Sequence, residues 1–268
     1  MRKKKIIVIQ CLALLILLIF FLRLPIVNKI QTGVLKSIDG AALLSNTYFG
    51  EDSDPHGHHK IYKLKGTERI LPHRVNSMER FRYLYNNFKG FECDIILSDG
   101  HLYVAHDPEE ISLLTWEHLL GKDVQQKIFW LDVKNLNLEN VQSFYARLDS
   151  LNDEFSLKDR IIIESGNPVP LKLIADSGYL TSLYFPVNYS THTLSPDSSV
   201  SLYIGNTGGL ISQDVFWLSL MNKSYPGRKK LIWDISFCTS VNADILKKHI
   251  ADTTILLCLI NVKSPGYR

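Results

Sequence analysis

The sequence predicts an α/β fold in which eight parallel strands, most of them followed by a helix, close into a barrel. From about residue 69 onward, short runs rich in Ile, Val and Leu alternate with amphipathic segments of helical spacing. This alternation is typical of a parallel sheet covered by helices. Eight such units in roughly 200 residues correspond to a compact (β/α)8 TIM barrel.

Eight segments have the apolar content and short length of buried strands, and a turn after residue 97 adds a return strand to the second of them. The predicted strands cover residues 69–75, 91–97 with the return strand 102–106, 127–133, 160–165, 180–187, 208–213, 229–236 and 253–262.

Segments with apolar residues three and four positions apart lie between most of these strands. Ser77 is suited to cap the first helix, and Gly178 is suited to end the fourth. A doubly wound open sheet is the alternative fold, but the loop after the first strand lacks the glycine-rich phosphate-binding signature of that class. The predicted helices cover residues 77–88, 115–121, 137–155, 168–178, 196–206, 214–223 and 242–252.

The amino-terminal residues predict a membrane anchor. Residues 1–5 are basic, and residues 6–23 contain an almost unbroken apolar run near the lower length limit for a spanning helix. A cleaved signal peptide is the alternative, but bulky residues follow the run where small ones are expected. An uncleaved, single-pass anchor places the basic end in the cytoplasm and the barrel on the extracytoplasmic side. Residues 24–68 are then a juxtamembrane stalk and entry segment, and residues 69–268 are the barrel domain.

The charge distribution gives no indication of a nucleic-acid partner. The net charge is +3, of which residues 2–5 supply four positive charges. The rest of the chain is therefore near −1, without a basic face. Three cysteines lie outside the apolar run, and Cys93 and Cys258 fall in predicted strands, where buried apolar roles are expected.

Acidic residues occur where predicted strands end, and the carboxyl ends of barrel strands form the active-site face. Glu92 and Asp94 are two residues apart on the second strand, so strand alternation points them to the same side. Asp132 ends the third main strand. Several carboxylates at one mouth repel each other without a cation, so these three residues predict a site for a hard divalent ion, Mg²⁺ or Ca²⁺.

Two histidines and two cations occupy comparable positions. His73 and His106 end strands at the same mouth and are suited to act as general base and general acid. Arg74 and Lys134 are suited to bind a phosphate. Together with a divalent ion, these groups predict metal-assisted cleavage of a phosphodiester.

These motifs resemble those of the glycerophosphodiester phosphodiesterase-like (PLC-like) superfamily. The group's "HRG", "E-x-D…V-x-HD" and "E-x-K" blocks are similar to "PHRVNS", "FECDIILSDGHLYVAHD" and "WLDVKN" of this sequence. Within the superfamily, these motifs are most similar to those of the menorin-like branch. The resemblance is specific over residues 70–135. It implies an acid/base pair of His73 and His106, and a phosphate contact by Arg74 and Lys134. It also implies metal ligands at Glu92, Asp94 and Asp132, and a polar site residue at Asn76.

The sequence departs from this group at several positions. Val75 replaces the glycine after His-Arg, and Asp132 replaces the usual glutamate. The later "ENT" and an inserted glycerol-binding subdomain are absent. These departures make glycerophosphodiesters uncertain substrates, while the histidines and metal ligands remain.

Three functions follow as hypotheses. The first is a membrane-anchored phosphodiesterase acting on a small phosphodiester, a lipid headgroup or a cell-envelope polymer. The second is a barrel that binds an anion or partner without catalysis. The third is a glycosidase using Glu92 and Glu164, which leaves the histidines and Lys134 unexplained.

Overall fold

The computed structural model describes residues 59–121, 124, 126–185, 187–188, 193–194, 210–236, 240–262 and 264–265. The predicted helix 196–206, the basic end, the predicted anchor 6–23 and most of the segment 24–68 lie outside these residues. Within the described part of the chain, no helix is long and apolar enough to cross a membrane.

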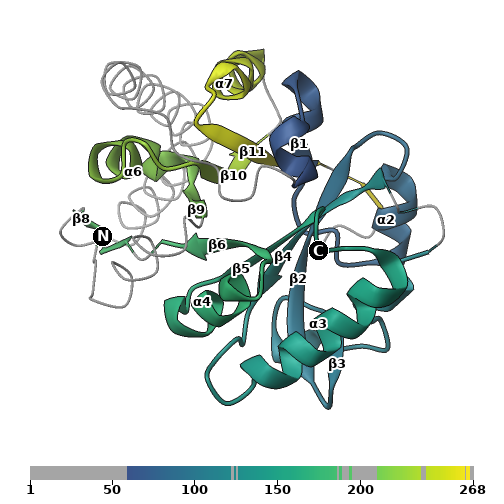
Figure 1. Cartoon of the computed structure of the whole chain (residues 1–268). Helices are drawn as coiled ribbons and strands as arrows, with labels where there is room; N and C mark the ends of the chain where they lie inside the picture. The colour runs from purple at the N-terminus through teal and green to yellow at the C-terminus, as the bar shows by residue number, and fades with distance from the viewer. Residues whose placement is uncertain are drawn as a thin grey trace, which may run out of the picture.

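A curled sheet of nine strands forms the centre of the molecule, in the order β1-β11-β10-β9-β6-β5-β4-β2-β3 (Figure 1). Neighbours pair in parallel, except that β3 forms an antiparallel hairpin with β2. The eight parallel strands are β1 (Ile70–Pro72), β2 (Gly90–Ser98), β4 (Ile128–Val133), β5 (Ile161–Ser165), β6 (Leu180–Tyr184), β9 (Leu210–Asp214), β10 (Lys230–Ser236) and β11 (Ile255–Asn261). The return strand is β3 (His101–Val104), and a separate hairpin joins β7 (Val187–Asn188) and β8 (Thr193–Leu194).

The helices lie on the outside of the curled sheet (Figure 1). They are α2 (Met78–Leu84), α3 (Val141–Phe155), α4 (Pro168–Asp176), α6 (Leu218–Ser224) and α7 (Ser240–Ala251), with short 3-10 helices at Lys60–Lys63, Gly66–Arg69, Pro108–Glu110, Trp116–His118 and Val215–Trp217. Ser77 caps α2 by accepting a hydrogen bond from the Arg80 backbone N–H. Gly178 follows α4 with φ +85°, a left-handed conformation that favours glycine.

The segment after β1 brings the two ends of the parallel series together. The Val75 N–H donates to the Glu92 carbonyl at 2.8 Å, and the Asp94 N–H donates to the Asn76 side-chain oxygen at 3.0 Å. Through these bonds the segment after β1 contacts β2, so the sheet takes a barrel-like shape. The α/β prediction with eight parallel strands is therefore confirmed.

Several element boundaries differ from the prediction. β1 has three residues instead of seven, because Arg74 takes a left-handed backbone conformation, φ 55°, that ends the extended run. The predicted helix 115–121 contains only the 3-10 helix Trp116–His118. The predicted helix 137–155 begins at Val141. Asn140 Oδ1 accepts from the Asn137 N–H and Asn137 Oδ1 accepts from the Asn140 N–H, while the Asn140 amide donates to the Asn135 carbonyl, as asparagine does in turns.

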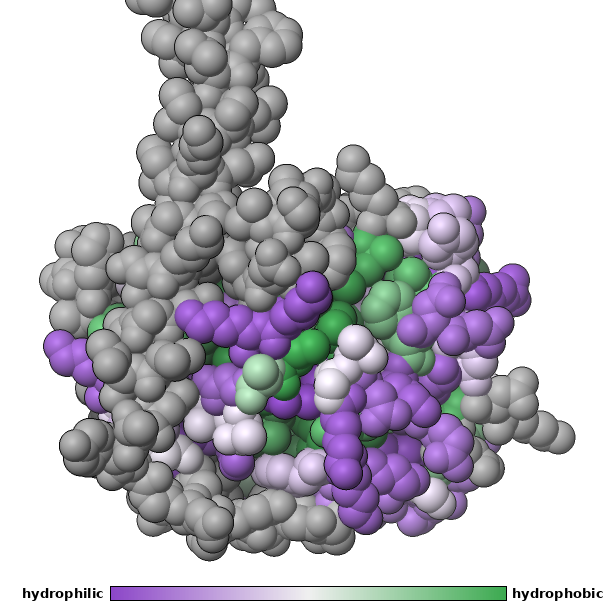
Figure 2. All heavy atoms as spheres, turned by 90° about the horizontal axis from the view of Figure 1, so that it is seen from above, coloured by the Kyte–Doolittle hydropathy of each residue, from purple (hydrophilic) through white to green (hydrophobic). Residues whose placement is uncertain are grey.

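Apolar side chains fill two layers. Those inside the barrel include Trp130 of β4, Ile162 of β5 and Leu180 of β6, with Ile61 from the entry segment packed among them. A larger cluster packs between the sheet and the helices and contains Cys93. Cys93 and Cys258 are both buried free thiols, as predicted. On the face shown in Figure 2, hydrophobic residues lie in a band between groups of hydrophilic ones.

Gly90 shows how closely two strands approach at the start of β2. A Cβ at this position would lie 2.2 Å from the Ile128 carbonyl oxygen, its partner in register on β4. Only glycine fits there without displacing backbone. This fixes the register that places Glu92 opposite Trp130 and Asp94 opposite Asp132.

Candidate active site

Along each strand, alternate residues face the barrel interior, and these residues change from apolar to polar toward the carboxyl end of the strand. Trp130 faces the apolar interior, and Asp132 follows two residues later on β4. Ile162 and Glu164 have the same relation on β5. Because residues i and i+2 share a face, the polar residues gather above the core at the carboxyl ends of the strands.

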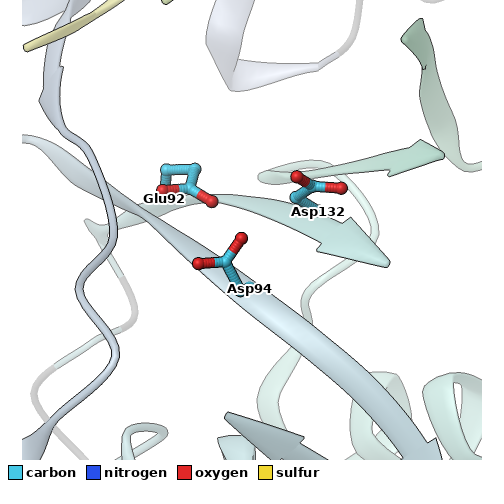
Figure 3. A group of neighbouring side chains, drawn as sticks. All are labelled: Glu92, Asp94 and Asp132. Carbon is cyan, nitrogen blue, oxygen red and sulfur yellow. The ribbon is translucent and has the colours of Figure 1, made fainter. Parts of the chain in front are cut away.

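Three carboxylates meet at this end. Glu92 and Asp94 come from β2 and Asp132 from β4, and one oxygen of each lies within 4.8 Å of the others. Figure 3 shows the three side chains pointing toward one another. Glu92 and Asp94 are each only 1% exposed. The convergence that the sequence predicted for these acids is therefore present in the structure.

Lys134 is the nearest cation to two of these acids. Its Nζ lies 2.6 Å from Asp94 Oδ1 and 2.5 Å from Asp132 Oδ2. Burial alone would lower the pKa of Lys134, but the two aspartates outweigh burial and raise it, so the ammonium stays charged. Lys134 therefore compensates two of the three negative charges only in part, and it does not pair with Glu92 in the structure.

The acids have shifted pKa values for identifiable reasons. Burial, followed by the charges of Asp94 and Asp132, raises the pKa of Glu92 well above its usual range. Burial also acts to raise the pKa of Asp94, but Lys134 and the Asn76 amide reverse the shift and lower it. Burial and the nearby Asp94 raise the pKa of Asp132 despite Lys134. Repulsion of this kind is what a bound divalent cation would relieve.

His73 lies directly after β1, beside Glu92. Its Nε2 is 3.8 Å from Glu92 Oε2, and its Nδ1 is 3.0 Å from the Asn261 side-chain oxygen. An amide oxygen only accepts hydrogen bonds, so this contact places the proton of a neutral His73 on Nδ1 and leaves Nε2 as the acceptor facing the acids. Asn261 ends β11 and was not among the residues predicted for the site.

His106 is held by a different pair of residues. Its Nδ1 lies 2.9 Å from Asp107 Oδ2, and its Nε2 lies 3.2 Å from Arg74 Nη2. Asp107 accepts the Nδ1 proton, so Nε2 accepts from the Arg74 guanidinium in the neutral ring. The Arg74 backbone N–H also donates to Glu92 Oε2, which the left-handed conformation of Arg74 makes possible. Such conformations concentrate at functional sites.

Asn76 supports Asp94. Its amide nitrogen donates to Asp94 Oδ2 at 2.5 Å, while its oxygen accepts from the Asp94 N–H. Asn76 is not one of the described residues that line the cavity. Its direct contact is with Asp94. Its predicted contact with substrate stays a prediction.

A cavity of about 420 Å³ lies over these groups. Both histidines, Arg74 and Lys134 line it, together with an acid, Glu164, and an aromatic pair. The full lining comprises His73, Arg74, Glu92, His106, Asp132, Val133, Lys134, Glu164, Gly166, Tyr184, Trp233 and Leu259. The cavity therefore contains both predicted histidines, both predicted phosphate contacts and two of the three predicted metal ligands.

Sequence reasoning only partly found the residues that hold the histidines. The adjacent His106–Asp107 pair stood out as part of the "V-x-HD" motif, but no role was given to Asp107. Asn261 lies 188 positions from His73, and only the barrel closure brings them together. Tyr184 ends β6 and Trp233 lies within β10, but aromatic residues in apolar strands do not stand out from core residues.

The fold and site define a barrel-like α/β protein with a charged cavity at the carboxyl ends of its parallel strands. No protein-family model matches the sequence, and no curated protein matches it. Solved structures with a similar fold include glycerophosphodiester phosphodiesterases, at 14–16% sequence identity. The similarity to the superfamily that the motifs predicted is therefore confirmed at the level of the fold, while the menorin-like branch stays a prediction.

Three of these structures illustrate the similarity. A protein from Silicibacter pomeroyi assigned as a glycerophosphoryl diester phosphodiesterase has a TM-score of 0.54 and 14% identity, covering 75% of this chain and 91% of its own. A glycerophosphodiester phosphodiesterase from Parabacteroides distasonis has a TM-score of 0.52 and 16% identity, covering 74% and 94%. A protein from Agrobacterium tumefaciens, assigned to the same activity, has a TM-score of 0.50 and 15% identity, covering 73% and 94%.

Proposed function

We propose that this chain is a membrane-anchored, metal-dependent phosphodiesterase built on a (β/α)8 barrel. The observation that carries the proposal is a group of three carboxylates, two of which line one cavity together with two histidines and two cations. The similarity of fold to glycerophosphodiester phosphodiesterases supports it.

The donor set fits a hard divalent cation, Mg²⁺ or Ca²⁺. Glu92, Asp94 and Asp132 offer only oxygen ligands, and their mutual repulsion favours added positive charge. A cation held by these residues would neutralise phosphate oxygens and polarise the ester. Glu164 lies beside Asp132 in register on β5 but is not part of this group of three.

The residues of the chain itself supply the remaining chemistry. Arg74 and Lys134 attract the phosphate into the cavity and orient it. His73, held by Asn261 with Nε2 toward the acids, accepts a proton from the nucleophile. His106, held by Asp107, donates a proton to the leaving alkoxide once it is protonated. The two rings have different partners, a neutral amide and a carboxylate, which suits them to opposite roles.

One contact favours a second candidate, a barrel that binds an anion without catalysis. Arg74 Nη2 lies 3.2 Å from His106 Nε2, so the nitrogen that would exchange a proton is engaged. A phosphate that draws Arg74 toward itself would free this nitrogen. If a bound phosphate leaves the Arg74–His106 contact intact, the cavity binds the anion without cleaving it.

Hydrolysis of bis(p-nitrophenyl) phosphate by the full-length chain tests the proposal, with Mg²⁺, Ca²⁺ or Mn²⁺ added separately. Release of p-nitrophenolate should need one of these ions and fall by at least about 100-fold in His73→Ala. His101→Ala, at an exposed histidine on β3, is the matched control and should keep full activity. No hydrolysis with any ion, combined with thermal stabilisation by inorganic phosphate, would contradict the proposal and support the binding barrel.

The apolar run at residues 6–22 supports the anchor, with the barrel on the extracytoplasmic side. A substrate presented at a membrane, such as a lipid headgroup or a cell-envelope polymer, fits that location. Carbonate extraction of cell membranes tests the anchor. Full-length protein should remain in the membrane pellet, and recovery of uncleaved protein in the supernatant would contradict it.

A further inference from the structure

The segments that lead into the parallel strands lie at the amino end of the barrel, opposite the cavity, and carry more cations than acids. Their described acids are Glu68, Asp159 and Asp252, whereas their lysines with partly or fully exposed side chains are Lys60, Lys63, Lys65, Lys89, Lys158 and Lys229. The last turns of the helices change this balance little, because Asp153, Glu154 and Asp176 are offset by Arg82, Lys223 and Lys248. The described surface at this end is therefore positive.

Only part of this positive charge is neutralised within the fold. Glu68 and Asp159 each pair with one lysine, at 3.6 and 3.3 Å. Lys63 and Lys65 are exposed, and neither pairs with an acid in the part of the chain that the structure describes. Lys229 donates to a backbone carbonyl at 3.1 Å, which leaves its full charge uncompensated. An anionic surface placed against this end would therefore be attracted to it.

The chain enters the barrel at the same end. The Lys60 N–H donates to the Asp159 carbonyl at 2.7 Å, and Ile61, which is 2% exposed, packs with Ile162 near the start of β5. The proposed anchor, residues 6–23, is separated from this entry segment by 35 residues. A chain of that length reaches at most about 120 Å, so its length alone permits either end of the barrel to face the membrane.

The surface beside the cavity has the opposite charge. Asp107, Glu109 and Glu110 follow β3 next to His106, and all three acids are exposed. Glu139, just before α3, is a further exposed acid at this end. An anionic surface repels these side chains, so attraction at one end and repulsion at the other act in the same direction on the orientation of the barrel.

We infer that the amino end of the barrel docks on the surface of an anionic lipid bilayer, with Lys63 and Lys65 against the headgroups. The inference rests on the proposed anchor, which tethers this end to the membrane. Each lysine close to such a surface favours the docked state by about fivefold. Anionic polymers in solution also bind lysines, but the tether gives the bilayer a much higher effective concentration.

This orientation narrows the substrate class of the proposed phosphodiesterase. The cavity lies at the far end of the strands from the docked surface, and the seven residues of β10 alone span about 23 Å. A headgroup in the same bilayer is then out of reach of the two histidines. The substrate is a phosphodiester that arrives from the aqueous side, either a soluble small molecule or a cell-envelope polymer.

Lysine labelling of the full-length chain in nanodiscs tests the docking without requiring turnover. Nanodiscs of phosphatidylcholine are compared with nanodiscs that also contain phosphatidylglycerol, and a membrane-impermeant amine reagent is followed at each lysine by mass spectrometry. Lys63 and Lys65 should react at least about tenfold more slowly with phosphatidylglycerol present. Lys134, in the cavity, and Lys172, on the flank of α4, should react equally in both. About 1 M salt should remove the protection, because it shortens the Debye length to about 3 Å.

A single neutralised charge gives the matched comparison. Lys63→Gln should weaken the protection of Lys65 by about fivefold, whereas Lys172→Gln should leave it unchanged. Both variants should hydrolyse bis(p-nitrophenyl) phosphate at the rate of the unaltered chain, in either lipid, because neither residue lines the cavity.

Three results would overturn the inference. Equal labelling of Lys63 and Lys65 in the two lipids would show that the amino end does not dock. Protection of Lys134 in their place would mean that the cavity faces the bilayer. Protection by soluble dextran sulfate in neutral nanodiscs, with none from phosphatidylglycerol, would identify an anionic polymer as the partner.

Failures of the two proposals remain distinguishable. A chain that is not retained by neutral nanodiscs would refute the anchor, and the docking with it. Lipid-dependent protection without hydrolysis would refute the proposed catalysis and leave the docking standing. Hydrolysis without lipid-dependent protection would refute only the docking.

Discussion

The charged side chains at the two ends of the barrel differ in sign and in how they are compensated. At the amino ends of the strands, cations donate to backbone carbonyls. Arg160, just before β5, is 2% exposed and donates to the carbonyls of Val124, Lys127, Phe155 and Ser156. Lys127, just before β4, donates to the carbonyls of Tyr85 and Phe88. These contacts join loops that are distant in sequence, so this end stabilises the fold.

At the carboxyl ends, buried acids face one another. Glu92 has a raised pKa because of burial and its acidic neighbours, and Glu164 has a raised pKa because of burial and Asp132. Few backbone donors compensate them in the structure. The cations at the amino end therefore find hydrogen-bond partners within the fold, whereas the acids at the carboxyl end would gain from a bound ligand. Each end can therefore be perturbed with a distinct result.

The largest expected effect is on activity, at the carboxyl end. Glu92→Gln removes a proposed metal ligand but keeps an acceptor for the Arg74 N–H. Catalytic efficiency on bis(p-nitrophenyl) phosphate should fall by about 1,000-fold, which corresponds to about 4 kcal/mol. The melting temperature of the cation-free protein should stay equal or rise, because a repelling buried acid has been removed.

Glu109→Gln, at an exposed acid, is the control for loss of a negative charge and should change neither quantity. Loss of activity accompanied by a lower melting temperature in Glu92→Gln would mean that this acid stabilises the fold. The distinction between the two ends would then be wrong.

At the amino end, stability should change instead. Arg160→Met removes the guanidinium that donates to four carbonyls, and these acceptors lose charged donors in a buried place. We expect a loss of about 3 kcal/mol in unfolding free energy, or about 6–12 °C in melting temperature. Activity measured well below the melting temperature should be retained. Urea unfolding and the phosphodiesterase assay give the two readouts.

Lys172→Ala is the matched control, because Lys172 pairs with Asp176 at 2.6 Å on the exposed face of α4. Its effect should stay within about 0.5 kcal/mol. An equal, small effect of Arg160→Met would show that the amino-end contacts do not stabilise the barrel.

The fold followed from the sequence because strand alternation is a local signal. The eight parallel strands lie close to their predicted positions, since each carries its own apolar pattern. β1 was shorter than predicted, because the left-handed backbone at Arg74 is set by its contact with Glu92. The helix predicted at 115–121 is also shorter in the structure, where it is the 3-10 helix Trp116–His118 with Trp116 buried.

The site was predictable where a residue stands out by its type. Acids and histidines on apolar strands or at their ends are unusual, so Glu92, Asp132 and His73 were found. Asn261 and Trp233 are ordinary residues for such positions, and their roles depend on contacts across the closed barrel. Sequence alone gives no measure of these contacts.

The acid end also predicts how stability depends on pH without a cation. Raised pKa values at Glu92 and Glu164 mean that the folded state keeps protons that the unfolded state releases. Their stabilising contribution is therefore complete below the usual glutamate pKa and is lost as pH rises through the raised values. Asp94 has a lowered pKa and acts in the opposite sense. Its contribution to folding stability is present above the usual aspartate pKa and is lost only as the pH falls through the lowered value.

In EDTA, the melting temperature should therefore fall as the pH rises above the usual glutamate pKa and through the raised values. The fall should be smaller in Glu92→Gln, and added Ca²⁺ should restore stability at the higher pH. Each kcal/mol corresponds to about 2–4 °C in a domain of this size. A melting temperature in EDTA that rises over this range would contradict the assignment of repulsion to the carboxyl end.

The smallest expected effect concerns the orientation of one ring at the carboxyl end. Asn261→Ala removes the acceptor at His73 Nδ1 but leaves the backbone fixed, because Arg80 donates to the carbonyls of His73 and Val262 at 2.9 and 2.7 Å. Only the ring is freed, so kcat should fall by about tenfold while KM and melting temperature stay nearly constant. Asn261→Asp, which keeps an acceptor, should recover most of kcat. An unchanged kcat in Asn261→Ala would show that Glu92 alone orients His73, whereas a fall in melting temperature of several degrees would make Asn261 a structural residue of the seam between β1 and β11.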